Sequence, residues 1–245
     1  MSTALELDRV GISFGGVRAV QDVSLRLEGG ERRTVIGPNG AGKTTLFNLI
    51  AGQLRPDHGR VLLDGRDVTA QPPFRRSRGG LARTFQISRL FRGLTVRENV
   101  ALALEGREGF TLALFARSVK SRALRLRVET LLESWNLAAF ADDPIEQMSH
   151  GNQRLLDIAM ALANEPRVLL LDEPTAGLSG NERDLVADRL HHLPRNITVL
   201  LTDHDMDVVF DIADRITVLN FGSVAAEGTP DEIRADTLVQ SIYFE

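Results

Sequence analysis

The chain has 245 residues, a formal net charge of −4 at pH 7, 43% hydrophobic residues and no cysteine. This length fits one large or two small domains, and the hydrophobic fraction is ample for a packed core. The absence of cysteine excludes disulfides and thiolate metal sites, and the acidic balance gives no general reason to expect a nucleic-acid partner.

The N-terminal segment MSTALELDRV lacks the basic start and apolar centre of a signal peptide. The longest purely apolar runs, such as VLLL at 168–171, are far shorter than the roughly 18 residues of a membrane-spanning helix. We therefore predict a soluble protein of the cytoplasm, with no transmembrane helix.

Strand patterns dominate the first 68 residues. LELDRVGISF (5–14) and VSLRL (23–27) alternate apolar and polar residues, and GRVLLDGRDV (59–68) is typical of a hairpin that turns at Asp64-Gly65. A further strand, RTVI, follows the Gly29-Gly30 turn. We expect an N-terminal antiparallel β subdomain here.

A cluster of arginines follows, interleaved with phenylalanines. Two interpretations stay open: a solvated surface, or a surface that faces a partner. The arginines are Arg75, Arg76, Arg78, Arg83, Arg89, Arg92 and Arg97, and the phenylalanines are Phe74, Phe85 and Phe91.

From about residue 95 to 164 the hydrophobic period is helical. One apolar stripe runs along a single face, with arginines off it. Its members are Leu124, Val128, Leu131, Leu132 and Trp135. We predict an inserted α-helical subdomain at approximately 87–164.

Continuous apolar runs return after the helical region. RVLLLDE (167–173) and ITVLLTDH (197–204) are typical of buried parallel strands, whose carboxyl ends build a site. ITVLNFGSVAAEG (216–228) is expected to form a hairpin, and TPDE (229–232) is a capping box with proline at the first helical position. We therefore expect a C-terminal helical extension at approximately 229–245.

Residues 37–44, GPNGAGKT, fit the phosphate-loop pattern, and they follow a strand and precede a helix as that motif requires. Backbone N–H groups of such a loop wrap phosphates, Lys43 reaches the terminal phosphates and the Thr44 hydroxyl coordinates Mg²⁺. Only Lys43 and Lys120 are lysine among 29 basic residues. A compact ammonium fits a phosphate cradle better than a planar guanidinium does. The sequence therefore predicts an α/β fold with a P-loop NTPase core and a mostly parallel central sheet.

Two acids, Asp172 and Glu173, stand at the end of a predicted buried strand. Side chains of adjacent residues on an extended chain point in different directions. One acid can therefore contribute to the Mg²⁺ coordination shell while the other faces the attacking water. His204 ends the next predicted strand and is placed to reach the terminal phosphate.

Five ordered motifs resemble those of an ATP-binding-cassette (ABC) ATPase over essentially the whole chain. They are GPNGAGKTT, Gln86 in RTFQ, MSHGNQR, LLLDEPTAGLS and TDH. Three segments resemble more narrowly the ATPase subunits of branched-chain amino acid importers: FGGVRAV (14–20), RTFQISRLFRGLTVRENV (83–100) and DEPTAGLS. Related importers of urea and amides share these motifs.

The resemblance implies a role for each motif. Phe14 would stack on adenine, Glu173 would be the general base, Gln86 would sense Mg²⁺ and the attacking water, and His204 would hold the terminal phosphate. The ATP-binding set further comprises Gly37, Pro38, Asn39, Gly40, Ala41, Gly42, Lys43, Thr44 and Thr45. The metal set comprises Thr44, Gln86 and Asp172. The cofactors implied are ATP and Mg²⁺, and residues 1–245 would form a single ABC ATPase domain.

The segment MSHGNQR implies a partner of the same kind. In the family this signature loop binds the ATP of a facing subunit in a head-to-tail dimer, and its residues here are Ser149, His150, Gly151, Asn152 and Gln153. Compared with the usual Leu-Ser-Gly-Gly-Gln, the chain keeps the serine and one glycine. Ser179 also stands where an aspartate is common, in a loop that serves communication between the two ATP sites.

The function implied is ATP hydrolysis that powers a membrane importer of branched-chain or other amino acids, at the cytoplasmic face of the plasma (inner) membrane. Its partners would be integral membrane permease subunits, a related or identical second ATPase subunit and, indirectly, an external solute-binding protein, with no nucleic acid. Two alternatives stay open: a soluble ABC ATPase of a non-transport machine, such as iron–sulfur cluster assembly, and an importer of urea or amides.

Overall fold

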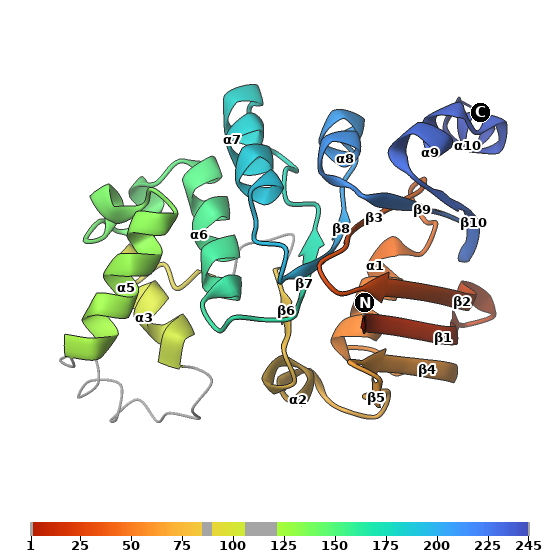
Figure 1. The fold of residues 1–245 in the computed structure, drawn as a ribbon, viewed down its shortest axis with the longest axis horizontal. Coiled ribbons are helices and arrows are strands. Elements are labelled where there is room, and N and C mark those ends of the chain that lie inside the picture. Colours follow the sequence, from red (N-terminus) through yellow and green to blue (C-terminus); the bar gives the residue numbers. More distant parts are fainter. Residues whose placement is uncertain (1, 85–89, 106–121, 245) are drawn as a thin grey trace.

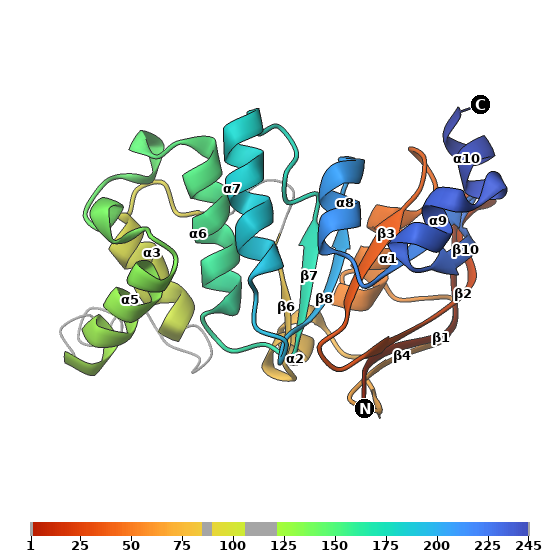
Figure 2. The same ribbon diagram turned by 45° about the horizontal axis from the view of Figure 1, so that its top comes forward.

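A computed structural model describes residues 2–84, 90–105 and 122–244 (Figure 1). Two sheets form the framework, and the helices between residues 96 and 162 gather at the end of the molecule away from the antiparallel sheet (Figures 1 and 2). This arrangement confirms the predicted α/β fold class, with its antiparallel N-terminal sheet and its inserted helices.

The antiparallel sheet has four strands in the order β2-β1-β4-β5. Their bounds are β1 Thr3–Phe14, β2 Val17–Glu28, β4 His58–Leu63 and β5 Arg66–Asp67. The predicted hairpin forms as expected, because Leu63 pairs with Arg66 across the Asp64-Gly65 turn.

The second sheet has six strands in the order β10-β9-β3-β8-β7-β6, all pairs being parallel except the β9–β10 hairpin. The bounds are β3 Arg32–Ile36, β6 Leu81–Arg83, β7 Val168–Asp172, β8 Thr198–Thr202, β9 Arg215–Asn220 and β10 Ser223–Gly228. Parallel strands end at one edge of a sheet, so the loops after β3, β7 and β8 come together.

The helices of the described residues either cover a face of this sheet or pack beyond it in the inserted region. They are α1 Lys43–Ala51, α2 Pro73–Arg78, α3 Val96–Glu105, α5 Arg122–Ser134, α6 His150–Leu162, α7 Gly180–His191, α8 Met206–Ile212, α9 Pro230–Ala235 and α10 Thr237–Phe244, with short 3₁₀ turns at Ala138–Phe140 and Ile145–Gln147. The capping box expected at TPDE is present at the start of α9. In the part of the chain that the structure describes, no helix combines the length and apolarity needed to span a bilayer.

Strand β7 shows why the sheet is buried on both faces. Leu169 and Leu171 pack with α6, α7 and the helices beyond them, whereas Val168 and Leu170 face the opposite core with α1 and the antiparallel sheet. Side chains alternate across a strand, so a continuous apolar run serves two cores at once. Helix α1 lies between the two sheets, which places its N-terminus at the carboxyl edge of β3 (Figure 2).

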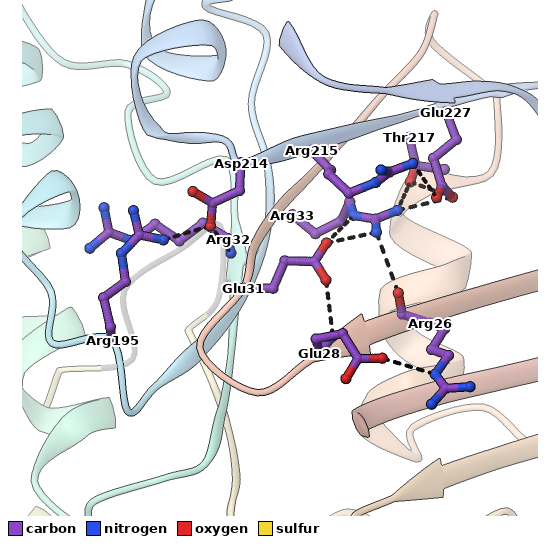
Figure 3. A network of polar contacts seen from close by, with 10 residues as sticks. All are labelled: Arg26, Glu28, Glu31, Arg32, Arg33, Arg195, Asp214, Arg215, Thr217 and Glu227. Atoms are coloured by element: carbon purple, nitrogen blue, oxygen red, sulfur yellow. Dashed lines mark hydrogen bonds and ion pairs between the residues drawn. The ribbon is translucent and has the colours of Figure 1, made fainter. Parts of the chain in front are cut away.

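A buried arginine joins the two sheets (Figure 3). The guanidinium of Arg33, on β3, lies 2.6 Å from Glu31 and 2.9 Å from Glu227 of β10, and it donates to the Thr217 hydroxyl of β9 at 3.0 Å. It also donates to the carbonyl of Arg26 on β2 at 3.3 Å. Two carboxylates and two neutral acceptors surround the Arg33 guanidinium. These contacts compensate the free-energy cost of burying its charge.

The arginine cluster between 75 and 97 is not one continuous surface. Arg76 is only 1% exposed, Arg83 is paired with a buried carboxylate and Arg97 bonds Asp142 at 2.8 Å. Arg75, Arg78 and Arg92 are exposed, and Arg89 lies outside the described residues. Neither interpretation left open for this cluster describes all of it, because Arg76, Arg83 and Arg97 are each bonded within the fold.

Arg76 closes the C-terminus of α1 from another helix. Its guanidinium donates to the carbonyls of Leu49 and Ile50 at 2.6 and 2.7 Å, and to those of Thr69 and Gln71 at 2.9 and 3.0 Å. The last carbonyls of a helix have no partner within it, and a cation is favourable there. Burial lowers the pKa of Arg76 to about 10, with Asp67 opposing the shift.

Replacing Arg76 by methionine is expected to lower the free energy of unfolding by about 2–4 kcal/mol, because buried carbonyls lose their donor while the aliphatic stem is kept. Arg78 is exposed on the same helix, so Arg78→Met is the matched control and should cost less than about 0.5 kcal/mol. Urea denaturation of the two variants measures the difference. Equal losses would show that the capping contacts contribute nothing.

Candidate functional site

The carboxyl edge of the parallel sheet opens into a cavity of about 580 Å³. Its lining comes from the start of β2, from the loop before α1 and from the ends of β7, β8 and β9. The lining residues are Gly16, Val17, Arg18, Ala19, Gln21, Asn39, Gly40, Ala41, Gly42, Lys43, Thr44, Thr45, Glu173, His204 and Phe221. Most of these residues belong to the motifs from which the sequence predicts an ATP site.

The phosphate loop ends in a helix start that is shaped to receive an anion. Gly42 caps α1 with a φ of +102°, and a Cβ there would overlap the Ala19 carbonyl oxygen, so glycine is required. Among the described residues, no side chain caps this helix. Its first N–H groups therefore stay available for a phosphate at the positive end of the helix dipole.

Lys43 is held beneath the loop. Its ammonium donates to the carbonyls of Gly37 and Pro38 at 2.6 and 3.1 Å, and the residue is 8% exposed. Burial lowers the pKa of Lys43, while the nearby carboxylates of Glu173 and Asp172 oppose the shift. The ammonium is thus bonded to the loop and close enough to the acidic pair to feel its charge, a position from which it could bind terminal phosphates.

Asp172 and Glu173 point in different directions, as predicted. Asp172 Oδ2 pairs with Arg83 at 3.0 Å, and its Oδ1 accepts from the Thr202 hydroxyl at 3.1 Å. Glu173 instead turns toward His204, with its Oε1 2.8 Å from Nε2. The partner Arg83 was not predicted, because nothing local in RTFQ links it to a strand 89 residues away.

Glu173 has a left-handed backbone, with φ +48°, which is uncommon for a residue with a side chain. Its N–H donates to the Thr202 carbonyl at 3.0 Å, and its own carbonyl accepts from Arg154 at 2.8 Å. Arg154, 6% exposed on α6, also donates to the carbonyls of Asp172 and Pro174, both at 2.9 Å. These bonds fix the turn that aims the Glu173 carboxylate into the cavity.

The loop after β8 is fixed by an aspartate that the sequence analysis did not single out. Asp203, 4% exposed, accepts from the N–H groups of His204 and Asp205 at 2.8 and 3.0 Å, and from the Thr175 hydroxyl at 2.6 Å. It joins the loops after β7 and β8, so that His204 faces Glu173. Its place beside the histidine in TDH was the only local signal.

The oxygen donors at this edge suit a hard cation. Thr44 is exposed in the first turn of α1, and the Asp172 carboxylate ends β7. Among the described residues there is no group of three or more His, Cys, Asp or Glu that could hold a metal alone. Mg²⁺ is commonly bound by one or two protein oxygens of this kind together with substrate phosphates.

Phe14, which was expected to stack on adenine, is not among the residues that line the cavity. Phe14 ends β1 and is 48% exposed, and the cavity is lined by Gly16 and Val17 just after it. Phe221, 81% exposed in the β9–β10 turn, lines the cavity although no sequence pattern marked it. Gln86 lies outside the described residues, so its role stays a prediction.

The signature loop forms a second helix start, apart from this cavity. Ser149 caps α6 and its hydroxyl accepts from the Asn152 N–H at 3.2 Å, while the Gln153 amide donates to the carbonyls of Ile145 and Met148 at 3.1 Å. Ser149 and His150 are exposed. None of residues 149–153 lines the cavity that holds the phosphate loop.

A phosphate loop before a helix, facing an acidic pair and a histidine at the ends of neighbouring strands, defines a P-loop nucleoside triphosphatase. The chain belongs to the ABC transporter family, whose model matches residues 20–176. It is thus an ATPase of the ATP-binding-cassette type.

Known proteins resemble the chain over nearly its full length. The high-affinity branched-chain amino acid transport ATP-binding protein BraF of Pseudomonas aeruginosa is 39% identical, covering 98% of this chain and 96% of BraF. The ADP conformation of the ATP-binding cassette MJ1267 matches with a TM-score of 0.87 and 28% identity, covering 100% of this chain and 99% of that one. A dimeric post-hydrolysis state of the cassette MJ0796, bound to ADP and Pi, matches with a TM-score of 0.77 and 27% identity, covering 92% and 98%.

Proposed function

We propose that this chain is the ATP-hydrolysing subunit of a membrane importer of branched-chain or other amino acids. The observation that carries the proposal is the 39% identity to BraF over 98% of the chain, because BraF is a branched-chain amino acid transport ATP-binding protein. Residues 1–245 act as a single ABC ATPase domain. Within it, approximately 87–164 form the inserted helical subdomain and approximately 229–245 the C-terminal extension.

In this proposal the phosphate loop, Asn39 to Thr45, binds the phosphates of ATP through its N–H groups and through Lys43. Thr44, Asp172 and Gln86 would hold Mg²⁺, which would supply positive charge opposite the phosphates. Glu173 accepts a proton from the attacking water, and the 2.8 Å contact to His204 fixes the direction of its carboxylate until nucleotide binds. His204, half exposed, is then free to turn to the terminal phosphate.

Loop 149–153 serves the ATP of a facing subunit. Its exposed Ser149 hydroxyl and the N–H groups at the start of α6 supply donors, and it does not line the cavity of its own chain. The dimeric state of the related cassette MJ0796 supports pairing of two such subunits. Two helix starts in one chain then bind two different nucleotides.

The partners in this proposal are integral membrane permease subunits, a second ATPase subunit that is identical or related, and an external solute-binding protein that acts through the permease. The chain would lie peripherally at the cytoplasmic face of the plasma membrane. Similarity to BraF favours this assignment over a soluble non-transport ATPase or an importer of urea or amides.

Affinity purification of the chain from membranes in mild detergent tests the assignment. We expect integral membrane subunits and a second ATPase to copurify, and we expect the reconstituted assembly to hydrolyse ATP faster when an external binding protein delivers leucine, isoleucine or valine. Stimulation by urea or a short amide instead would favour the other importers. A chain that binds only soluble proteins would contradict transport altogether.

A further inference from the structure

The carboxylate of Glu182 lies between the first turns of two helices. Its Oε2 accepts from the Ser179 N–H at 3.2 Å and from the Ser179 hydroxyl at 2.7 Å, at the start of α7. Its Oε1 accepts from the Gly151 N–H at 2.9 Å, at the start of α6. One side chain thus connects loop 149–153 with the loop that carries Ser179.

The contact depends on the absence of a side chain at residue 151. A Cβ on Gly151 would lie 2.8 Å from Glu182 Cβ and 2.9 Å from its Cγ, closer than real carbon contacts. The Gly151 N–H, then the hydroxyl and N–H of Ser179 and the Ser149 side chain, lower the pKa of Glu182 to about 2. Glu182 is therefore an anion at any physiological pH, bound where a helix offers its positive end.

We propose that Glu182 is a positioning residue that occupies, within its own chain, the donors that loop 149–153 offers to the terminal phosphate of a facing subunit's ATP. The inference rests on the facing-subunit role of that loop under the proposed function. The Gly151 amide has a single hydrogen to donate, so a phosphate oxygen that accepts it competes with Glu182 Oε1. Two anions at one helix start also repel each other.

Glu182 consequently weakens ATP-driven pairing of the chains and makes it conditional on a local rearrangement. Once displaced from Gly151, the Glu182 carboxylate keeps only its bonds to Ser179. Phosphate binding at the start of α6 therefore breaks the contact between the start of α6 and the start of α7. That couples phosphate binding to the loop in which Ser179 replaces the usual aspartate.

One substitution separates the charge of Glu182 from its hydrogen bond to Gly151. Glu182→Gln keeps an oxygen that accepts from Gly151 and removes the negative charge. Glu232→Gln is the matched control, because Glu232 bonds the Thr229 N–H at 2.7 Å in the capping box of α9 and its pKa is also lowered by that bond. Glu232 belongs neither to the cavity lining nor to loop 149–153.

The full-length chain is studied with Glu173→Gln in every variant, so that ATP is not consumed, and light scattering with MgATP gives the dimer dissociation constant. Glu182→Gln is expected to lower this constant about 25-fold, since unit charges about 4 Å apart in water repel by an amount worth about fivefold at each of two sites. Glu232→Gln should leave it unchanged. A fluorescent ATP analogue, at protein concentrations too low for pairing, should bind all variants within about twofold.

Equal or weaker pairing of Glu182→Gln, with a normal ATP-dependent dimer of the parent, would overturn the inference and leave the facing-subunit role intact. Absence of an ATP-dependent dimer in every variant would contradict that role, and the inference with it. Hydrogen exchange of segment 148–154 reports the contact itself, whether or not chains pair. Glu182→Ala should speed exchange at the Gly151 amide, and unchanged exchange would also overturn the inference.

Discussion

Replacing Glu173 by glutamine is expected to slow ATP hydrolysis by about 10²–10⁴, the usual contribution of a positioned general base, while ATP binding is kept. Glutamine has nearly the same shape and can still accept a hydrogen bond from His204, but it cannot take a proton from water. The phosphate loop and Lys43 are untouched, so nucleotide affinity should stay within about twofold of the parent chain. The variant should therefore accumulate as an ATP-bound dimer.

Single-turnover hydrolysis of radiolabelled ATP measures the chemical step separately from nucleotide binding and product release. Glu165→Gln is a suitable control, because Glu165 is an exposed glutamate with a φ of +50°, similar to the +48° of Glu173, in the turn before β7. It should hydrolyse ATP at the parent rate. Near-normal single-turnover rates in Glu173→Gln would remove Glu173 from the role of base.

Local patterns predicted most of this site because its chemistry is carried by short segments. GPNGAGKT already contains the glycines and the lysine of a phosphate loop, and the apolar run before Asp172 already requires a buried strand. Parallel strands share a carboxyl edge, so residues that end neighbouring strands were expected to build one site; the direct 2.8 Å contact between His204 and Glu173 was not predicted.

The residues that the sequence did not reveal act across long separations. Arg154 holds the turn around Glu173 from a helix, Arg76 caps α1 from α2, and Glu182 reaches Gly151 from the next helix. Each is an ordinary charged residue in its own segment, and its role exists only once the chain has folded. Neither hydrophobic periodicity nor motif spacing in the sequence identifies such partners. They are nevertheless needed, because burying a charge without a partner costs free energy.

Asp172 shows how residues distant in the sequence orient a side chain of the site. Both of its oxygens are bonded, one to Arg83 and one to the Thr202 hydroxyl, and Arg83 is itself fixed by Asn48 Oδ1 of α1 at 2.7 Å. The carboxylate is thus held in one orientation by groups on β6, β8 and α1. A strand-end acid was predictable from the sequence, but its fixed direction was not.

A mixture of two inactive variants is expected to regain ATPase activity if loop 149–153 serves the ATP of a facing chain. Lys43→Ala removes the ammonium bound to the Gly37 and Pro38 carbonyls and cannot hold its own phosphates. Ser149→Arg places a bulky side chain at the exposed start of α6. Each variant alone should have less than about 1% of the parent rate, since every site in its dimer carries a lesion.

A mixed pair differs, because one of its sites combines Lys43 of the second variant with Ser149 of the first. Random pairing makes half of the dimers mixed, with one intact site of two in each, so about a quarter of the parent rate is expected. If the loop served its own chain, every site in every mixture would stay damaged. The ATPase rate at a fixed total protein concentration, followed across mixing ratios, should peak near equal amounts.

The double variant Lys43→Ala/Ser149→Arg, mixed with the parent chain, is the reciprocal control. In a mixed pair its two lesions fall on different sites, so pairing should reduce activity below that of the parent dimers alone. Where the natural partner is a related ATPase, one lesion is placed in each protein and the same comparison is made. With Glu173→Gln in both chains, ATP-dependent association reports assembly even if one intact site does not turn over. Mixtures that stay inactive, with no ATP-dependent dimer at any concentration, would show that Ser149 and Gly151 do not act across an interface.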